Sequence, residues 1–386
     1  EAPIAGGTTA DVYAELKKNS GALPVNYLPA DDPAFFRALS CELRRGDLLA
    51  FVGAGDIDQK ARAWLKLRRA DEMKAKNWDD FAAALKPQLS AESRIAREES
   101  LAAKTTMRAG GAARIYAEPA NAADLQLLLR EAHARNVAIF FLGRGSNLIV
   151  PDEGVDGLVI SLVHESWQRF EPKPDGRVWA GAGLRLKNLC GLASKAGLTG
   201  FEFLEGIPGS VGGALRMNAG AMGGWIFDVV DEVEIMTPAG EVKTLRKAEM
   251  HVAYRHCAEL LDAVALGVLL RPTAQADADS IGRQIDVYRR KRHETQPREP
   301  SAGCIFKNPP GESAGRLIDR AGLKGERVGD AEISPVHANF IVNRGQATST
   351  EIIALMRRAR ARVREVFGIE LEPEVLLYGK KWEEVL

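Results

Sequence analysis

The sequence predicts an α+β protein of two or three domains, from the spacing of its apolar residues and from two glycine-rich runs. Short apolar runs of strand length, such as 264–270, alternate with longer segments in which apolar residues recur every three or four positions. The first glycine-rich run is 143–147, and the second, with seven glycines, is 205–224. A chain of 386 residues is long enough for this organisation.

Capping residues and apolar spacing place the individual elements. Helices are expected from Asn121, from Leu186 to a stop at Gly197, from Asp279 to Arg292, and from Thr348 to a stop at Gly368. Strands are expected at 137–142, 159–162, 177–180, 233–236, 242–245, 264–270 and 375–378. Thr348 and Glu351 have the spacing of a capping box, which marks the start of the last helix.

The first hundred residues divide into two different segments. Residues 1–68 follow a βαβα order, which is typical of an α/β sheet. Residues 69–100 carry many charges of both signs and are expected to form a solvated helical linker.

The composition excludes several classes of function. The formal net charge is zero, which argues against a nucleic-acid or acidic-membrane partner. The four cysteines are scattered without a Cys-x-x-Cys pair and the six histidines show no ligand spacing, so no metal site is expected. This cysteine usage and the lack of a visible signal peptide predict a cytoplasmic protein. No apolar run reaches the roughly 20 residues of a membrane-spanning helix.

Both glycine-rich runs can bring backbone N–H groups close to an anion, because glycine has no Cβ atom. In the second run Ser210 adds a hydroxyl, Arg216 a positive charge and Asn218 an amide. The first run, Gly143-Arg144-Gly145-Ser146-Asn147, lacks the third glycine of a Rossmann fingerprint. These features indicate a phosphate or pyrophosphate ligand, with an ordinary glycine-rich surface loop as the alternative.

The two runs resemble the pyrophosphate-binding loops of the flavin-dependent UDP-N-acetylenolpyruvoylglucosamine reductases, which carry Gly-x-Gly-Ser-Asn and Gly-Ile-Pro-Gly-Ser-Val-Gly-Gly in this order. The similarity extends from about Leu101 to Gly379. It implies an FAD-binding domain of the PCMH type, made of two α+β subdomains, and a C-terminal α+β domain for a UDP-sugar substrate. The FAD-binding residues that it implies are Arg108, Gly143, Arg144, Gly145, Ser146, Asn147, Gly206, Ile207, Pro208, Gly209, Ser210, Gly212, Gly213 and Asn218.

Three later motifs carry the resemblance to the reaction. They are Tyr254-Arg255, the run 301–309 around Cys304, and Leu371-Glu372-Pro373-Glu374-Val375. The resemblance implies NADPH-dependent, FAD-mediated reduction of UDP-N-acetylglucosamine enolpyruvate to UDP-N-acetylmuramate in peptidoglycan precursor synthesis. Arg255 and Glu374 would then face the negative charge that develops at C2 of the substrate, with Glu374 as a protonated donor or an orienting group.

Cys304 stands where this family usually has a proton-donating serine. A thiol with an ordinary pKa of about 8.5 is a stronger acid than an alcohol, so it can donate a proton at neutral pH. As a thiolate beside Arg255 it would have no proton to give. Cys304 is therefore expected to be the acid that protonates C2, held as a thiol. Taken alone, it would read as a buried cysteine behaving as a small apolar residue.

The resemblance also implies residues for the phosphates and the sugar of the substrate. These are Lys307 and Asn308 in the cysteine motif, with Arg292 and Gln296 near the end of the preceding helix. One subgroup of the family has an inserted segment with a tyrosine that covers the substrate. The stretch between the strand 264–270 and the cysteine motif is short and has no such insertion, so this chain is expected to lack that lid.

Residues 1–68 resemble the C-terminal end of the UDP-N-acetylmuramate–alanine ligases, in Glu1-Ala2-Pro3-Ile4 and in Gly53-Ala54-Gly55-Asp56-Ile57. The ATP-binding loop and central domain of that family are absent from the sequence, so no ligase activity is expected. The chain is therefore interpreted as the back part of a ligase–reductase fusion.

Two alternative functions stay open at this point. The first is another flavoenzyme of the same binding fold that oxidises alcohols or sugars, which the Cys304 and Glu374 motifs argue against. The second is an ATP-dependent ligase, or a scaffold left from one, with residues 1–68 as its working part. Flavin binding distinguishes the reductase from the ligase, and reoxidation of the reduced flavin by the enolpyruvyl substrate distinguishes it from the other flavoenzymes.

Overall fold

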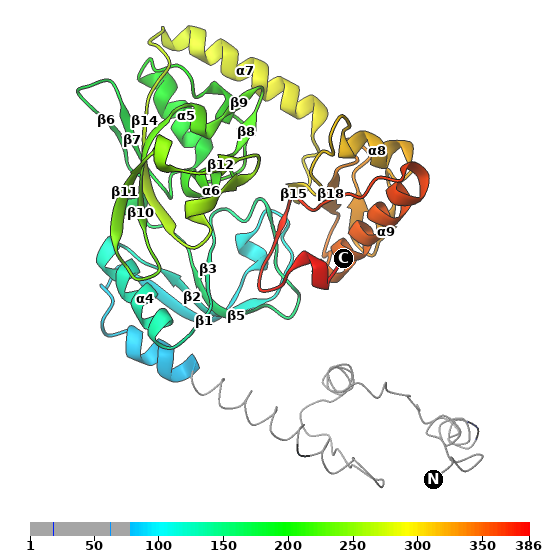
Figure 1. Ribbon diagram of the computed structural model, residues 1–386, viewed down its shortest axis with the longest axis horizontal. Coiled ribbons are helices and arrows are strands. Elements are labelled where there is room, and N and C mark those ends of the chain that lie inside the picture. The colour runs from blue at the N-terminus through cyan, green and yellow to red at the C-terminus, as the bar shows by residue number, and fades with distance from the viewer. Residues whose placement is uncertain (1–17, 19–61, 63–77) are drawn as a thin grey trace. The chain divides into compact units, whose positions relative to one another are not determined.

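Three sheets of four or five strands organise the described part of the chain, which comprises residues 18, 62 and 78–386 of the computed structural model (Figure 1). The unit from Asp80 to Leu386 contains all three. Apart from the two isolated positions, the ligase-like segment 1–68 lies outside the described residues.

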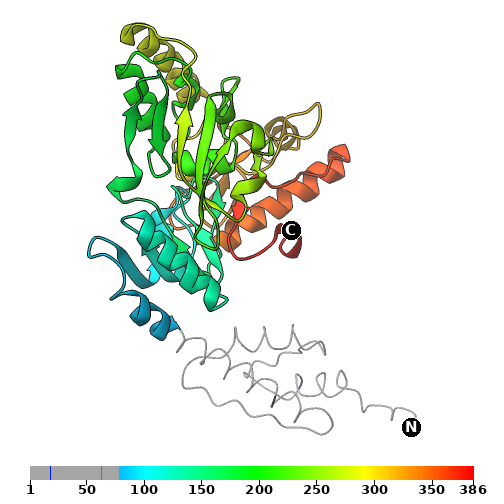
Figure 2. The ribbon, with the colours of Figure 1, turned by 60° about the vertical axis from the view of Figure 1, so that its left-hand side comes forward.

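The first sheet has the strand order β1-β2-β5-β3. Strand β1 (Arg94–Ser100) is antiparallel to β2 (Ala112–Glu118), and β5 (Val155–Ile160) runs parallel to both β2 and β3 (Ile139–Phe141). Helix α4 (Ala122–Ala134) makes the crossover from β2 to β3 and lies against this sheet, in cyan and green in Figure 2.

Asn121 starts helix α4 as predicted. Its side chain accepts a hydrogen bond from the N–H of Asp124, the third residue of the helix, and so satisfies one of the first free N–H groups. The apolar face predicted from the spacing is buried, and it comprises Leu125, Leu128, Leu129 and Ala132.

The charged segment 69–100 is not helical throughout, so the prediction of a helical linker is wrong for its end. Residues 78–85 are helical, but 94–100 form β1 and pair with β2 along its length. Most side chains of β1 are exposed or half-buried because it is the edge strand of the sheet. Charged residues are common on edge strands, where they discourage pairing with other chains, so the charge run concealed a strand.

The second sheet is fully antiparallel, with the order β11-β10-β14-β7-β6. Its strands are β6 (Phe170–Pro172), β7 (Val178–Gly181), β10 (Val230–Met236), β11 (Val242–Arg246) and β14 (Val264–Leu270). Strand β14 has the predicted bounds and is buried at every position, which explains its continuous apolar sequence.

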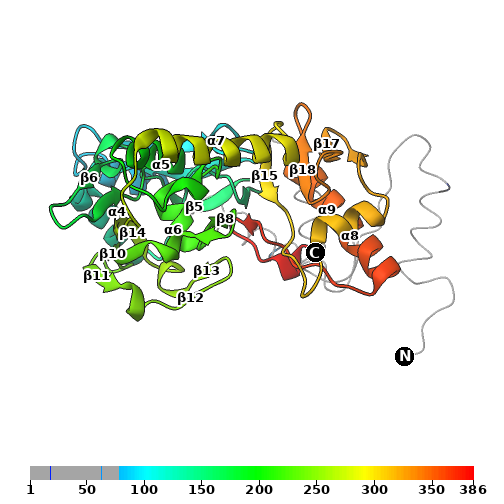
Figure 3. The ribbon, with the colours of Figure 1, turned by 90° about the horizontal axis from the view of Figure 1, so that it is seen from above.

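Three helices accompany the second sheet: α5 (Leu186–Lys195), α6 (Val211–Arg216) and α7 (Ala278–Thr295). Helix α6 is short and begins inside the second glycine-rich run, against β14. Helix α7 packs on α5 and continues toward the third sheet, as Figure 3 shows from above. The segment after α7 leads directly into β15 of the third sheet.

The third sheet has the order β15-β18-β17-β16, again antiparallel. Its strands are β15 (Ser301–Cys304), β16 (Arg327–Val328), β17 (Ala331–Ile333) and β18 (Phe340–Asn343), and its helices are α8 (Ala314–Arg320) and α9 (Ser349–Phe367). The predicted capping box is present, since Thr348 and Glu351 exchange hydrogen bonds. Gly368 ends α9 with a positive φ of 69°, a conformation that favours glycine.

The C-terminal segment returns from the third sheet to the first glycine loop. Strand β19 (Leu376–Leu377) pairs in parallel with β4 (Leu148–Ile149). The Leu376 N–H donates to the Asn147 carbonyl at 3.1 Å, and the Tyr378 N–H donates to the Ile149 carbonyl at 3.1 Å. Residues 376–378 therefore lie beside residues 147–149, at the end of the first glycine loop.

Among the described residues, no helix combines the length and the hydropathy that crossing a lipid bilayer would take.

Replacement of Asn343 by Ala should lower the free energy of unfolding by about 1–3 kcal/mol. Its buried amide donates to the Met107 carbonyl at 3.0 Å and accepts from the N–H groups of Gly345 and Ala347, each at 3.0 Å. Urea denaturation of Asn343→Ala beside the exposed-site control Gln346→Ala measures the effect. Equal midpoints for the two variants would show that this link is not stabilising.

Candidate active site

Arg255 and Glu374 form an ion pair, with 2.6 Å between Arg255 Nε and Glu374 Oε1. The hydroxyl of Tyr254 donates to the other carboxylate oxygen at 3.1 Å. Burial and the neighbouring Glu374 raise the pKa of Tyr254 to about 12, so this hydroxyl keeps its proton at neutral pH. Glu374 thus accepts a hydrogen bond at each oxygen and is 9% exposed.

A tight turn presents Tyr254 and Arg255. They are the two residues between β12 (Val252–Ala253) and β13 (His256–Cys257), which pair as a hairpin. Arg255 has a φ of 56°, in the left-handed region that disfavours residues with a Cβ. Such conformations persist where the surroundings hold them, and they cluster at functional sites.

Hydrogen bonds to both backbone groups of Glu374, its N–H and its carbonyl, fix its position. The Glu374 N–H donates to the Ile305 carbonyl at 2.8 Å, one residue after Cys304. The Glu374 carbonyl accepts from the side-chain amide of Asn147 at 3.2 Å. The same short segment therefore contacts both the cysteine motif and the first glycine loop.

Cys304 ends β15 and is half-buried. Burial and the carboxylate of Glu374 raise the pKa of its thiol, the charges of Arg255 and Arg292 lower it in part, and the net pKa is about 12. Glu374 pairs with Arg255 through its side chain and with Ile305, the residue after Cys304, through its backbone. The structure therefore brings together the three residues predicted to be catalytic.

The two glycine-rich runs meet at a cavity beside this place. A Cβ added to Gly143 would come within 2.9 Å of Ser210 Oγ, so the two loops pack directly on each other. The cavity is lined by Phe141–Arg144, Ile160–Val163, Ala182–Gly183, Ser210, Gly212–Gly213, Arg216, Leu260 and Ala263–Ala265. Among these described lining residues there are two arginines and no carboxylate.

Arg144 and Arg216 line this cavity, and no carboxylate lies among its described lining residues, although Asp262 is near enough to act on the charge of Arg216. Burial lowers the pKa of Arg216, and burial together with the charge of Arg185 lowers the pKa of Arg144. A lowered arginine pKa means that the positive charge is poorly stabilised, which a bound anion would correct. Two such cations and bare glycine backbone fit the pyrophosphate of FAD.

Other predicted FAD residues lie in the same loops but outside that lining. Gly145 packs against Thr105, and Ser146 lies near both Gly209 and Gly303. Gly206 has a φ of 74° and packs against the Arg292 side chain. Ile207 is half-buried against the core of the second sheet, and Pro208 is exposed.

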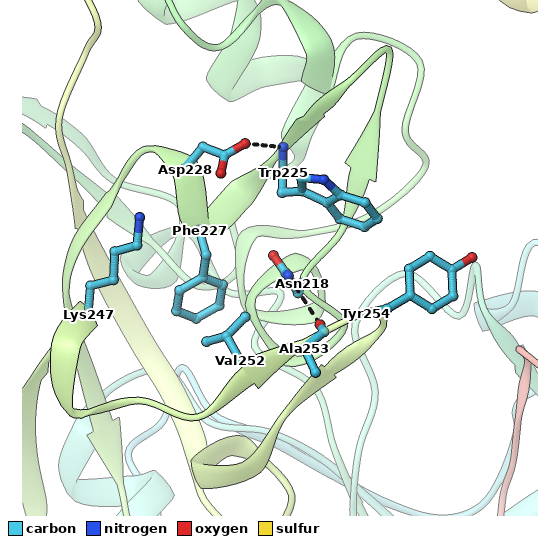
Figure 4. Close-up of a pocket in the computed structure, with 8 residues that line it drawn as sticks. All are labelled: Asn218, Trp225, Phe227, Asp228, Lys247, Val252, Ala253 and Tyr254. Carbon is cyan, nitrogen blue, oxygen red and sulfur yellow. Dashed lines mark hydrogen bonds between the residues drawn. The ribbon is translucent and has the colours of Figure 1, made fainter. Parts of the chain in front are cut away.

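Asn218 does not line the first cavity. It lies in a second one, together with Trp225, Phe227, Asp228, Lys247, Val252, Ala253 and Tyr254 (Figure 4). Its amide donates to the Ala253 carbonyl at 3.2 Å, while its Oδ1 is buried without a hydrogen-bond partner among the described residues. In this structure Asn218 holds the hairpin that carries Arg255.

The predicted substrate residues divide into two groups. Arg292 donates to the Gly206 carbonyl at 2.8 Å and to Gln296 Oε1 at 3.3 Å, and its charge reaches Cys304. Lys307 instead pairs with Glu372 at 3.2 Å, on the surface. Asn308 accepts a hydrogen bond from the Ala314 N–H at the start of α8, which is a structural use of its side chain.

Arg108, predicted to bind the cofactor, is exposed and has a φ of 57°. Neither cavity includes its side chain among the lining residues. Arg216, which the sequence indicated as a positive charge for a phosphate, does line the first cavity. Two residues outside the predicted set lie at the site: Tyr254 and Trp225. Tyr254 stands inside a motif that was recognised, so its neighbour Arg255 could have indicated it. Nothing in the sequence around Trp225 indicated its position beside Arg255.

Cys304 should stay uncharged between about pH 7 and pH 9, where an ordinary thiol with a pKa of about 8.5 ionises. Because its pKa is raised to about 12, the thiol keeps its proton throughout this range. The ultraviolet thiolate absorbance of the parent minus that of Cys304→Ser measures this thiol alone. A step in that difference near pH 8.5 would contradict the structure.

Two protein families match two successive parts of the chain. Residues 113–246 match the family described as an FAD binding domain. Residues 296–378 match the family described as the C-terminal domain of UDP-N-acetylenolpyruvoylglucosamine reductase. The first match contains both glycine runs, and the second contains Cys304 and Glu374.

Individual relatives cover most of the described chain. UDP-N-acetylenolpyruvoylglucosamine reductase 2 of Symbiobacterium thermophilum is 44% identical over 290 residues, which are 74% of this chain and 92% of that protein. The reductase of Heliobacterium modesticaldum is 42% identical over 289 residues, 73% of this chain and 90% of that protein. The crystal structure of the Thermus caldophilus reductase has a TM-score of 0.64 and 39% identity, over 74% of this chain and 99% of that chain. The predicted α+β fold with an FAD-binding domain is confirmed, and the chain belongs to the family of UDP-N-acetylenolpyruvoylglucosamine reductases.

Proposed function

We propose that this protein reduces UDP-N-acetylglucosamine enolpyruvate to UDP-N-acetylmuramate with FAD and NADPH, a step of peptidoglycan precursor synthesis. The observation that supports this most is the meeting of Arg255, Glu374 and Cys304 beside the two glycine loops. FAD, when bound, passes a hydride from NADPH to the enolpyruvyl group. Side chains of this protein would stabilise the negative charge that develops and supply the proton.

The FAD pyrophosphate would lie in the cavity between the two glycine loops. Arg144 and Arg216 would balance its charge, and Gly143, Gly212 and Ser210 would contact it closely. Because the described lining contains no carboxylate, nothing there repels an anion.

Arg255 has the charge that the reduction requires. Reduction of the enolpyruvyl double bond places negative charge on C2 and on the adjoining carboxylate, and a fixed cation stabilises it most where it needs no reorganisation. Glu374 accepts from both Arg255 and Tyr254, so we assign it as the orienting group of Arg255 and not as a proton donor.

Cys304 would supply the proton that C2 needs. Its raised pKa keeps the thiol protonated at neutral pH, so the proton is present when the charge develops. The nearby Arg255 and Arg292 would stabilise the thiolate that is left after the transfer.

Arg292 and Gln296 are proposed to contact the diphosphate of the substrate, with Lys307 and Asn308 at the edge of the same site. Residues 101–272 would then form the FAD-binding domain and 273–386 the substrate domain. A cytoplasmic location completes this proposal, because nucleotide-linked sugar precursors and NADPH are cytoplasmic compounds.

The N-terminal segment is proposed to derive from a UDP-N-acetylmuramate–alanine ligase, through a ligase–reductase fusion. This proposal rests on its motifs alone and assigns no ligase activity to residues 1–68. Alanine-dependent ATP hydrolysis by the purified chain would contradict the absence of ligase activity.

Anaerobic mixing tests the proposed function. The holoenzyme, first reduced with NADPH, should recover its flavin absorbance when UDP-N-acetylglucosamine enolpyruvate is added. Cys304→Ser should keep substantial turnover because a hydroxyl can also donate a proton. Cys304→Ala should lose roughly 10²- to 10⁴-fold in this step, the usual worth of general acid catalysis.

Cys190→Ala is the matched control, because Cys190 is a buried cysteine in the core of the second sheet. Its reduction by NADPH and its turnover should stay near those of the parent. No recovery of flavin absorbance in the parent would remove the proposed function, and a Cys304→Ala variant as fast as the parent would remove Cys304 from it.

A further inference from the structure

Trp225 is an aromatic residue at the site that the reaction above leaves without a role. Its ring centroid lies 5.6 Å from Cζ of Arg255. The Tyr254 ring lies 5.0 Å from the same atom, and the two rings meet edge to face, 5.7 Å apart at 78°. Two aromatic rings therefore lie against the guanidinium whose Nε is held by Glu374.

The position of Trp225 is set by its own neighbours. It belongs to β9 (Gly224–Trp225), which pairs with β8 (Gly220–Ala221). A Cβ at Gly220 would lie 2.3 Å from Cε3 of Trp225, so the indole covers bare glycine backbone. The backbone N–H of Trp225 donates to the Asp228 carboxylate at 2.8 Å, as Figure 4 shows.

Arg255 needs such support because a single hydrogen bond does not fix a long side chain. Among the described residues, only Nε of its guanidinium has a hydrogen-bond partner, so both Nη groups are available to a ligand. An aromatic ring attracts a cation near its face and restricts how a planar guanidinium can rotate.

We propose that Trp225 is a positioning residue, which with Tyr254 keeps the Arg255 guanidinium oriented so that its two Nη groups meet the substrate carboxylate. The inference rests on the proposed function. It adds to that function a residue that lies outside the lining of the cofactor cavity.

Three variants separate positioning from simple packing. Trp225→Leu removes the aromatic ring and Trp225→Phe keeps one. Trp179→Leu is the matched control, because Trp179 also covers a bare glycine, with a Cβ at Gly267 only 2.2 Å from its ring, and has no cation over it among the described residues.

Trp225→Leu should lower kcat for the enolpyruvyl substrate about 3- to 10-fold, the usual range of a cation–π contact. The rate of flavin reduction by NADPH should not change, because no negative charge develops on the enolpyruvyl group in that step. Trp225→Phe should restore most of the loss, and Trp179→Leu should keep the parental kcat. The Kd of the product UDP-N-acetylmuramate, measured by calorimetry on the holoenzyme, should rise by a similar factor only in Trp225→Leu.

A double-mutant cycle with Arg255→Gln, scored by the Kd of UDP-N-acetylmuramate, decides whether Trp225 acts through Arg255. The effect of Trp225→Leu should disappear when Arg255 is already Gln, because no cation is then left for the ring to attract. Additive losses, an unchanged Trp225→Leu enzyme, or a Trp225→Phe enzyme as impaired as Trp225→Leu would each overturn the inference. A parent enzyme that leaves the substrate unreduced would instead overturn the proposed function.

Discussion

The ion pair between Arg255 and Glu374 joins positions 119 residues apart, and the rest of the site is arranged around it. Arg255 comes from a hairpin beside the second sheet, and Glu374 comes from the segment that leaves the third sheet. The pair can form only because that segment is held by Ile305 on one side and by Asn147 on the other. A partly buried pair of this kind contributes little net stability, since desolvation offsets much of its attraction. The pair matters for function because it fixes the position of the Arg255 guanidinium in the site.

The same pair sets the chemistry of Cys304. Burial and the carboxylate of Glu374 keep the thiol protonated, while Arg255 and Arg292 are near enough to favour the thiolate once the proton has gone. One carboxylate thus orients the cation and preserves the acid. The cavity between the two glycine loops has two arginines and no carboxylate in its described lining, which suits the pyrophosphate proposed to bind there.

Local signals in the sequence predicted much of the fold. The cap at Asn121, the capping box at Thr348 and the buried run 264–270 all have short-range physical causes, and the structure confirms them. The prediction for 94–100 was wrong because strand pairing with β2, a long-range contact, overrode a charge pattern that also suits an exposed helix.

The site was predictable where a motif is continuous in sequence. The glycine runs and the motifs of Arg255, Cys304 and Glu374 were visible, but Trp225 becomes informative only when folding places it over Gly220 and beside Arg255. Asn218 shows the same limit, since an amide in a glycine-rich run is chemically suited to a ligand, yet the fold directs its N–H group to the Ala253 carbonyl.

Replacement of Glu374 by Gln tests the central claim most directly, because glutamine keeps the size of the side chain and removes its charge. The variant should retain FAD and be reduced by NADPH as the parent is. After anaerobic addition of UDP-N-acetylglucosamine enolpyruvate, its flavin absorbance should recover at least about 10-fold more slowly, since Arg255 is no longer held in place. Recovery at the parental rate would contradict the account.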